Sequence, residues 1–463
     1  MLLAAAERLE PLDTELAHQT YLRAFSAAMY AGRFAGATDL AEVAAAAPRI
    51  TPDRASRGDM LLAGMASMVR DGYPAALPIV RRALRAYRTE EISVSEGLRS
   101  LWVAGVAAAD VWDDESFDAL TARFVATARD AGALSELLFA INARVIMLMF
   151  AGEHGAAASV IDEARAVREA IGSERPLYEI IVSGAWQGRV EHTLPLIQAT
   201  LSEVMARGEG IGTTVTQWAN ALLFNSLGRY EDALGPARAA GEYPSELAAA
   251  NWGLVELIES ATGCGATDLA ADALKQLSEM TQASGTDWAL GVEARSRALL
   301  SEGGAAEPLY REAIERLGRT RLRAELARSR LLYGEWLRRE GRRLDAREQL
   351  RAAHTFFTAM RAEGFGERAR RALQATGERA HTYTVETRDE LTAQEAQIAR
   401  LAARQQTNAA IGAQLLISPR TVEWHLRKVF TKLGITSRRE LPEALPDTVP
   451  ETRPSRRTGR GDR

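Results

Sequence analysis

The chain has 463 residues, of which 47% are hydrophobic and 25% are charged. This length predicts more than one domain, and the globular composition excludes wholesale disorder. The formal net charge is −4, from 57 basic and 61 acidic residues, and as a total it argues against a nucleic-acid-binding protein.

The sequence lacks features of secreted or membrane proteins. Cys264 is the single cysteine, which excludes an internal disulfide framework and a cysteine-based zinc site. The charged Glu7 and Arg8 exclude a secretory signal. The most apolar run, 137–151, is short for a bilayer span and contains Arg144. We therefore expect a soluble, cytoplasmic protein without a membrane partner.

Turn-like segments recur about every 38 residues, and each is followed by an Ala-rich amphipathic run. They begin at Gly32, Gly72, Asp113, Gly152, Gly188, Gly228, Gly265, Gly304 and Gly341. Glycine suits a helix C-terminus, where φ often turns positive. The period leaves room for two helices of about 14 residues, which predicts a TPR-like helical-repeat superhelix whose stacked repeats share one core. The alternative is a non-repeating helical bundle in which glycines fall regularly.

The repeat pattern ends after Met360, and a short Arg-rich helix is expected over 367–375. A Thr-rich segment and a Pro-rich end then divide the remainder of the chain. The predicted organisation is a repeat domain over 1–380, a linker over 381–388, a compact helical domain over 389–445 and a disordered Arg/Pro-rich tail over 446–463.

The compact domain begins with an expected capping box. Thr392 and Glu395 have the spacing of such a box, and the helix they start runs through Ala403. Ile398 and Leu401 lie on its apolar side.

Two more helices follow with their own caps. Thr407 and Asn408 precede a helix that carries Ile411 and Leu415 four residues apart. After a short break, Ser418 is the expected N-cap of a third helix, with proline at its first position. Two helices joined by such a short turn form a helix-turn-helix pattern.

The third helix, over 419–433, has two opposed faces. Val422, Leu426, Val429 and Leu433 form an apolar stripe. The opposite face carries Arg420, Trp424, Arg427, Lys428 and Thr431. An exposed tryptophan among cations suits a large anionic partner, and a helix of this width fits the DNA major groove. The alternative is that Trp424 packs against the repeats and the cations are only solvated.

The residues of this domain closely resemble the LuxR-type helix-turn-helix. The resemblance rests on 391–395 (Leu-Thr-Ala-Gln-Glu), Thr407-Asn408, 417–435 and 437–441. It implies a four-helix domain that places its third helix in the major groove of double-stranded DNA. By resemblance, Glu423, Trp424 and Arg427 would face base edges. Arg420, Thr421, Lys428 and Lys432 would hold phosphates, together with Ser418 and the helix start at Thr407 and Asn408.

Two positions depart from that family pattern. The turn between the first two helices usually contains glycine but reads Arg404-Gln405-Gln406 here. Pro442 and Pro446 shorten the fourth helix, which in the family commonly contributes to dimerisation. A two-fold operator would still require a homodimer on DNA.

The first 380 residues resemble the helical-repeat region of the large ATP-binding, MalT-like class of LuxR regulators. Those regulators carry a P-loop ATPase ahead of the repeats, but no Gly-Lys-Ser/Thr occurs in this chain. We therefore expect no nucleotide cofactor. The chain is interpreted either as a short-form regulator or as a truncated reading frame.

Other motifs do not predict a catalytic, cofactor or metal site. The glycines of 208–212 lack a preceding strand and a third spaced glycine, so we expect a loop between repeat helices rather than a dinucleotide site. The six histidines form no metal-binding pair, and His425 is expected to pack through a hydrogen bond. No nucleophile, base and acid share a credible spacing, so an enzyme is not predicted.

The charge distribution revises the first impression. From Ala396 onward there are 13 basic and 6 acidic residues, and the rest of the chain holds 44 and 55. We predict a DNA-binding transcriptional regulator whose repeats bind an effector or a protein partner, with RNA polymerase as a further partner. The alternative is an interaction scaffold whose concave repeat face binds a protein or peptide, without sequence-specific DNA binding.

Overall fold

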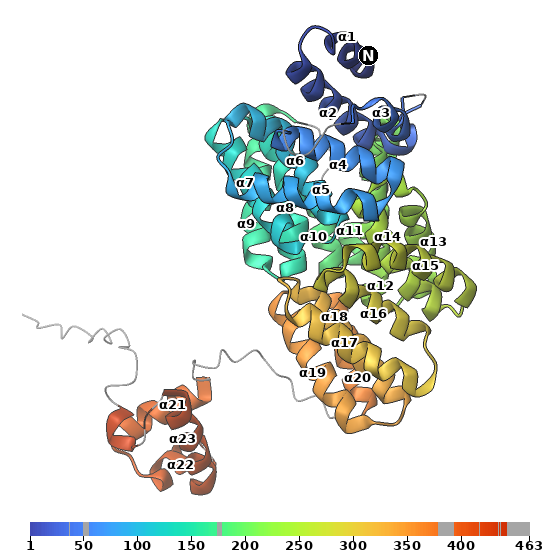
Figure 1. Cartoon of the computed structure of the whole chain (residues 1–463). Helices are drawn as coiled ribbons and strands as arrows, with labels where there is room; N and C mark the ends of the chain where they lie inside the picture. The colour runs from blue at the N-terminus through green and yellow to red at the C-terminus, as the bar shows by residue number, and fades with distance from the viewer. Residues whose placement is uncertain are drawn as a thin grey trace, which may run out of the picture. The chain divides into compact units, whose positions relative to one another are not determined.

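The computed structural model describes residues 1–36, 38–49, 55–173, 178–377, 393–415, 417–433, 435 and 437–441. These residues form 23 α-helices, and no strand occurs among them (Figure 1). The predicted all-α class is therefore confirmed. Contacts divide the chain into Met1–Ala380 and His381–Arg463, which we call the repeat unit and the C-terminal unit. The predicted linker and tail lie outside the described residues.

The first half of the repeat unit contains α1 (Leu2–Leu9), α2 (Thr14–Ala31), η1 (Gly32–Phe34), α3 (Leu40–Ala46), α4 (Arg57–Asp71), α5 (Tyr73–Thr89), α6 (Val94–Asp110), α7 (Asp114–Asp130), α8 (Leu134–Ala151), α9 (His154–Ile171) and α10 (Tyr178–Gln187). The second half contains α11 (Val190–Arg207), α12 (Gly210–Leu227), α13 (Tyr230–Gly241), η3 (Pro244–Glu246), α14 (Ala248–Gly263), α15 (Thr267–Ser284), α16 (Asp287–Leu300), η4 (Gly303–Ala305), α17 (Ala306–Gly318), α18 (Arg323–Arg339), α19 (Arg343–Ala359) and α20 (Glu363–Ala375). Many of these helices have 17 or 18 residues, more than the 14 expected.

All nine predicted turns lie between helices. Gly152 and Gly228 end α8 and α12 with φ of 80° and 72°, values that glycine adopts without a Cβ penalty. At the one turn without glycine, Trp112 takes φ 60° and Asp113 caps α7 by accepting a hydrogen bond from the Ser116 N–H at 2.9 Å.

The repeat unit has an inner and an outer layer of helices. Successive even-numbered helices from α8 to α16 contact one another as well as their sequence neighbours, as do α18 and α20. The ion pair of Arg295 with Glu325 joins α16 to α18. Inner helix α14 buries 14 of its 16 residues, whereas outer helix α15 buries five of 18. Stacking of the inner helices therefore builds the continuous core that the repeat pattern predicts.

The superhelix also packs against itself from one turn to the next. Helices ten places apart touch, namely α2 with α12, α5 with α15, α8 with α18, and α10 with α20. Polar contacts join the same turns: Arg33 pairs with the fully buried Glu246 at 2.9 Å, and Ser284 Oγ donates to the Val111 carbonyl at 2.6 Å. In a simple solenoid each repeat contacts only its neighbours, so this winding is tighter than the sequence predicted.

A column of aromatic rings fills the inner side of the superhelix. Trp186, Trp218, Trp252 and Trp288 come from successive inner helices, and each is at most 5% exposed. The ring of Phe150 contacts all four, with centroid distances of 5.3 to 6.1 Å. The chain's own side chains therefore pack closely around Phe150.

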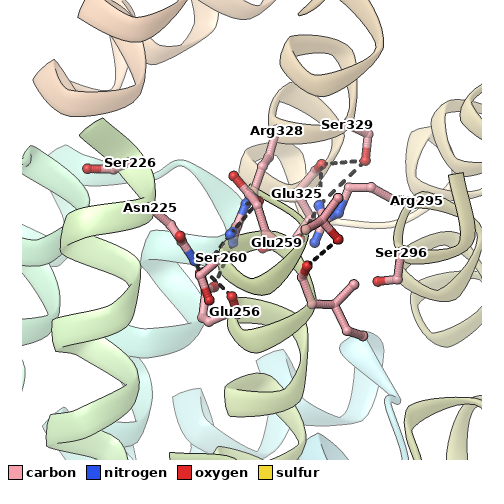
Figure 2. Close-up of polar contacts among 12 residues, drawn as sticks. Asn225, Ser226, Glu256, Glu259, Ser260, Arg295, Ser296, Glu325, Arg328 and Ser329 are labelled. Atoms are coloured by element: carbon pink, nitrogen blue, oxygen red, sulfur yellow. Dashed lines mark hydrogen bonds and ion pairs between the residues drawn. The ribbon is translucent and has the colours of Figure 1, made fainter. Parts of the chain in front are cut away.

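Beside this column lies a buried network of charged residues from α14, α16 and α18, joined by Asn225 of α12 (Figure 2). Arg368 of α20 also belongs to this network. Arg328 donates to Glu256 at 2.6 Å and to Glu259 at 2.9 Å, and Arg368 donates to Glu259 at 2.7 Å. Burial opposes the charge on Glu259, but Arg328 and Arg368 outweigh it and lower the pKa of this carboxyl to about 2. Each buried charge is thus matched by a partner on another repeat.

Two sequence predictions fail within the repeat unit. Helix α20 begins at Glu363 and buries Phe365 and Arg368 against other helices, so the repeat packing continues past Met360. The predicted loop over 208–212 is wrong beyond Glu209, because α12 begins at Gly210. A Cβ on Gly212 would clash with the Tyr178 hydroxyl, so this glycine permits close helix packing.

Helix α8 is the one helix among the described residues that is long and apolar enough to cross a membrane. A core helix passes the same test, and 56% of this helix's apolar window is buried inside the repeat unit. Arg144 on α8 also pairs with Asp118 on α7 at 2.6 Å.

Candidate nucleic-acid interface

The C-terminal unit contains α21 (Ala393–Ala403), α22 (Asn408–Leu415), α23 (Pro419–Leu433) and the 3-10 turn η5 (Arg438–Glu440). All three helices contact one another. They enclose a separate core made of Ile398, Ala399, Leu401, Ala402, Ile411, Val422, Leu426, Val429 and Leu441. This core fixes the orientation of α23 with respect to the two preceding helices.

Side-chain caps set where the second and third helices begin. Thr407 Oγ1 accepts from the Ala410 N–H at 3.2 Å, and Ser418 Oγ accepts from the Thr421 N–H at 3.1 Å. Both predicted N-caps are confirmed, as is the start of α23 at proline. The capping box expected from Thr392 and Glu395 is not tested, because Thr392 lies outside the described residues.

The turn between α21 and α22 is held by a residue whose role the sequence did not predict. Gln405 takes φ 61° at the turn where the family usually has glycine. Arg438 reaches over from η5, donating to Asn408 Oδ1 at 2.7 Å and to the Ala402 carbonyl at 3.3 Å. It also donates to the Gln406 carbonyl. Arg438 therefore supports the backbone on which the helix-turn-helix is built.

The two faces of α23 have the predicted character. Val422, Leu426 and Val429 are at most 5% exposed. On the other side, Trp424 is 53% exposed and the Arg427 side chain is 81% exposed. Trp424 is therefore not part of the core of the C-terminal unit, and its ring lies on the surface of that unit.

Short-range pairs align the exposed side chains. Lys428 Nζ lies 4.0 Å from the centre of the Trp424 indole, a cation–π contact worth about 0.5–1 kcal/mol at an exposed site. Arg427 donates to Glu423 Oε1 at 3.4 Å, and an exposed pair of this kind contributes about 0.5 kcal/mol. Both pairs hold these side chains on one face of α23, and both can open at little cost.

The residues predicted to contact DNA differ in their exposure to solvent. Arg420, Glu423, Trp424, Arg427 and Lys428 are exposed along α23, and Ser418 and Thr407 are exposed at helix starts. Thr421 and Asn408 are half-buried, and the side chain of Lys432 lies outside the described residues. Because Asn408 Oδ1 is engaged by Arg438, a phosphate contact by Asn408 would use its N–H groups.

His425 packs as predicted, but one of its ring nitrogens lacks the expected hydrogen bond within the described part of the chain. It is half-buried and its ring lies against Trp424, with centroids 4.8 Å apart. Its Nδ1 is buried and makes no hydrogen bond with any described residue. The expected packing is present, but the expected hydrogen bond is missing at this nitrogen.

Comparison with known proteins agrees with this geometry. Residues 389–443 match the family model described as bacterial regulatory proteins, luxR family. A search of curated proteins finds no match to the chain. The matched segment contains all three helices, both confirmed caps and the cationic face of α23. Residues 389–443 are therefore a LuxR-family helix-turn-helix domain.

Proposed function

We propose that this chain is a transcription regulator that reads a DNA operator with the exposed face of α23. The LuxR-family domain supports DNA binding and transcription regulation. The observation that carries the finer proposal is the exposure of Trp424 and Arg427 opposite a buried stripe on the same helix.

The chemistry of this face suits the major groove. An arginine such as Arg427 can bind guanine O6 and N7 with two hydrogen bonds, Glu423 can accept from the cytosine amino group, and the apolar Trp424 can contact a thymine methyl. Arg420, Thr421, Lys428 and Lys432 are assigned to phosphates. The capped starts of α22 and α23, at Thr407 and Ser418, add backbone N–H groups for the same purpose.

The repeat unit is proposed to receive the signal. Residues before Ala396 hold 44 basic and 55 acidic residues, so DNA should repel this part of the chain and leave it free for another ligand. A small-molecule effector or a protein partner would act there, and RNA polymerase is a further proposed partner of the chain. A two-fold operator would add a second copy of the chain.

The test is DNA binding by the full chain across a salt series. Affinity should fall steeply with salt, because phosphate contacts release counterions. Arg427→Ala should reduce discrimination between operator and non-operator DNA by about 1–3 kcal/mol. Arg400→Ala is the matched control, because it removes the same charge from an exposed position on α21. Binding that does not depend on salt, or equal effects of the two variants, would contradict the proposal.

A further inference from the structure

A cavity of about 100 Å³ lies within the repeat unit, on the inner side of the superhelix. Its walls combine helices of two successive turns, with Tyr30 from α2 and Trp102 from α6 facing Val215 from α12 and Trp252 from α14. A ligand bound in this cavity would therefore contact both turns of the superhelix.

The cavity walls are largely aromatic. Tyr30, Trp102 and Phe139 form a cluster with ring centroids 5.0 to 6.1 Å apart. These three rings are only half-buried, although rings of the neighbouring column, such as Trp186 and Trp218, are at most 1% exposed. Partly exposed aromatic rings around a hollow are typical of a site for a small apolar ligand.

One polar atom of the walls lacks a partner. The hydroxyls of Tyr30 and Tyr178 both donate to Glu209 Oε2, at 2.9 and 2.7 Å, so that carboxylate is already engaged. Asn142 also lines the cavity, and its Oδ1 is buried without a hydrogen bond to any part of the chain that the structure describes. An unsatisfied buried acceptor costs free energy. Oδ1 has almost no accessible surface, so a ligand donor would recover this free energy once the Asn142 amide rotates toward the cavity.

We infer that this cavity binds a small aromatic molecule with one hydrogen-bond donor, and that this molecule is the effector of the repeat unit. The second part rests on the proposed regulatory function. A cavity of about 150 Å³ holds benzene, so a ring in this smaller space must reach into the mouth between the half-exposed side chains. Because the walls come from both turns, binding would favour the wound form of the superhelix.

Phenol and toluene are the probes for a test on the full chain. They have nearly the same shape, but only phenol donates a hydrogen bond. Saturation-transfer NMR and calorimetry should show saturable phenol binding about tenfold tighter than toluene binding. In Asn142→Leu this preference should disappear, because the acceptor is removed.

Filling the cavity supplies a second readout. Ala143→Leu places extra carbon in the space and should weaken both probes at least tenfold. Ala156→Leu, at an exposed position of α9, is the matched control and should leave both affinities unchanged. Val106→Phe fills the cavity from α6, so a folding defect in one filling variant does not decide the result.

Two results would overturn the inference. They are the absence of saturable phenol binding to the wild-type chain, and equal affinities for phenol and toluene. DNA binding by the same samples separates this inference from the proposed function. Phenol binding without DNA binding would support the cavity and contradict the regulator, whereas DNA binding without phenol binding would contradict the cavity site alone.

Discussion

At the residue scale, Gln405 occupies a backbone conformation that its side chain disfavours. Its φ of 61° lies in the left-handed region, which costs an L-residue about 1–2 kcal/mol and glycine almost none. The turn it forms sets the start of α22, and Arg438 braces that turn from η5. The hydrogen bonds of Arg438 thus support a turn that lacks the usual glycine.

Replacing this residue should stabilise the C-terminal unit. Gln405→Gly should raise its free energy of unfolding by about 0.5–1 kcal/mol, since relief of backbone strain exceeds the entropy lost on ordering glycine. Gln397→Gly, in the exposed interior of α21, should lower it by about 1 kcal/mol. Urea unfolding of both variants checks the prediction, which would be wrong if the two shifts had the same sign.

Asp110 is a buried acid whose charge is unfavourable. It accepts from the Tyr73 hydroxyl at 2.8 Å and the Asn251 amide at 2.9 Å, but burial raises its pKa to about 7. The unfolded chain loses this proton near pH 4. Between about pH 4 and pH 7 the folded state therefore binds more protons, and this group's contribution to stability falls as pH rises.

Asp110→Asn should remove that pH dependence. Relative to the wild type, the variant should gain about 2–4 kcal/mol of stability between pH 4 and pH 8. Urea unfolding at several pH values measures the difference, and Asp272→Asn at an exposed position of α15 is the control. A wild-type-to-variant difference that stays constant with pH would refute the assignment.

At the element scale, the spacing of apolar residues along the sequence predicts a helix when its buried face repeats every three or four residues. The stripe of Val422, Leu426 and Val429 could be predicted because a helix that covers a core repeats its apolar residues every three or four positions. The extension of α20 could not be predicted, because an arginine in a sequence is usually a surface residue. Arg368 is buried only because Glu259 and Glu335, from other helices, accept its hydrogen bonds. The same limit applies to Arg438, whose acceptors are about 30 residues away.

The buried network should be sensitive to loss of a single charge. Glu259→Gln leaves Arg328 and Arg368 with less negative charge in a buried setting and should destabilise the repeat unit by about 3–5 kcal/mol. Glu348→Gln, on the exposed side of α19, should change stability little. Chemical unfolding followed by circular dichroism compares them, and equal midpoints would contradict the role given to Glu259.

At the scale of the whole molecule, the sequence predicted the repeat but not its tight winding. Glycines and apolar spacing report on one repeat at a time, whereas Arg33 and Glu246 meet across 213 residues. The cavity beside Asn142 likewise forms only where two turns of the superhelix pack against each other. For this reason the exposed cationic face of α23 could be predicted from a short segment, while the cavity required the folded chain.

Charge also distinguishes the ends of the molecule. The segment from Ala396 onward has 13 basic and 6 acidic residues, whereas the preceding chain is acidic. A near-neutral total thus hides a basic DNA-binding end on an acidic repeat unit, and long-range attraction to DNA should come from the basic end.

The central claim is sequence-specific DNA binding through α23, and selection from a random duplex library by the full chain tests it most directly. The wild-type chain should enrich one recurrent motif at physiological salt. Trp424→Ala and Arg427→Ala should relax the motif at one or two positions, whereas Arg400→Ala should leave it intact. Recovery of an unenriched library by the wild-type chain, in repeated rounds, would contradict the account.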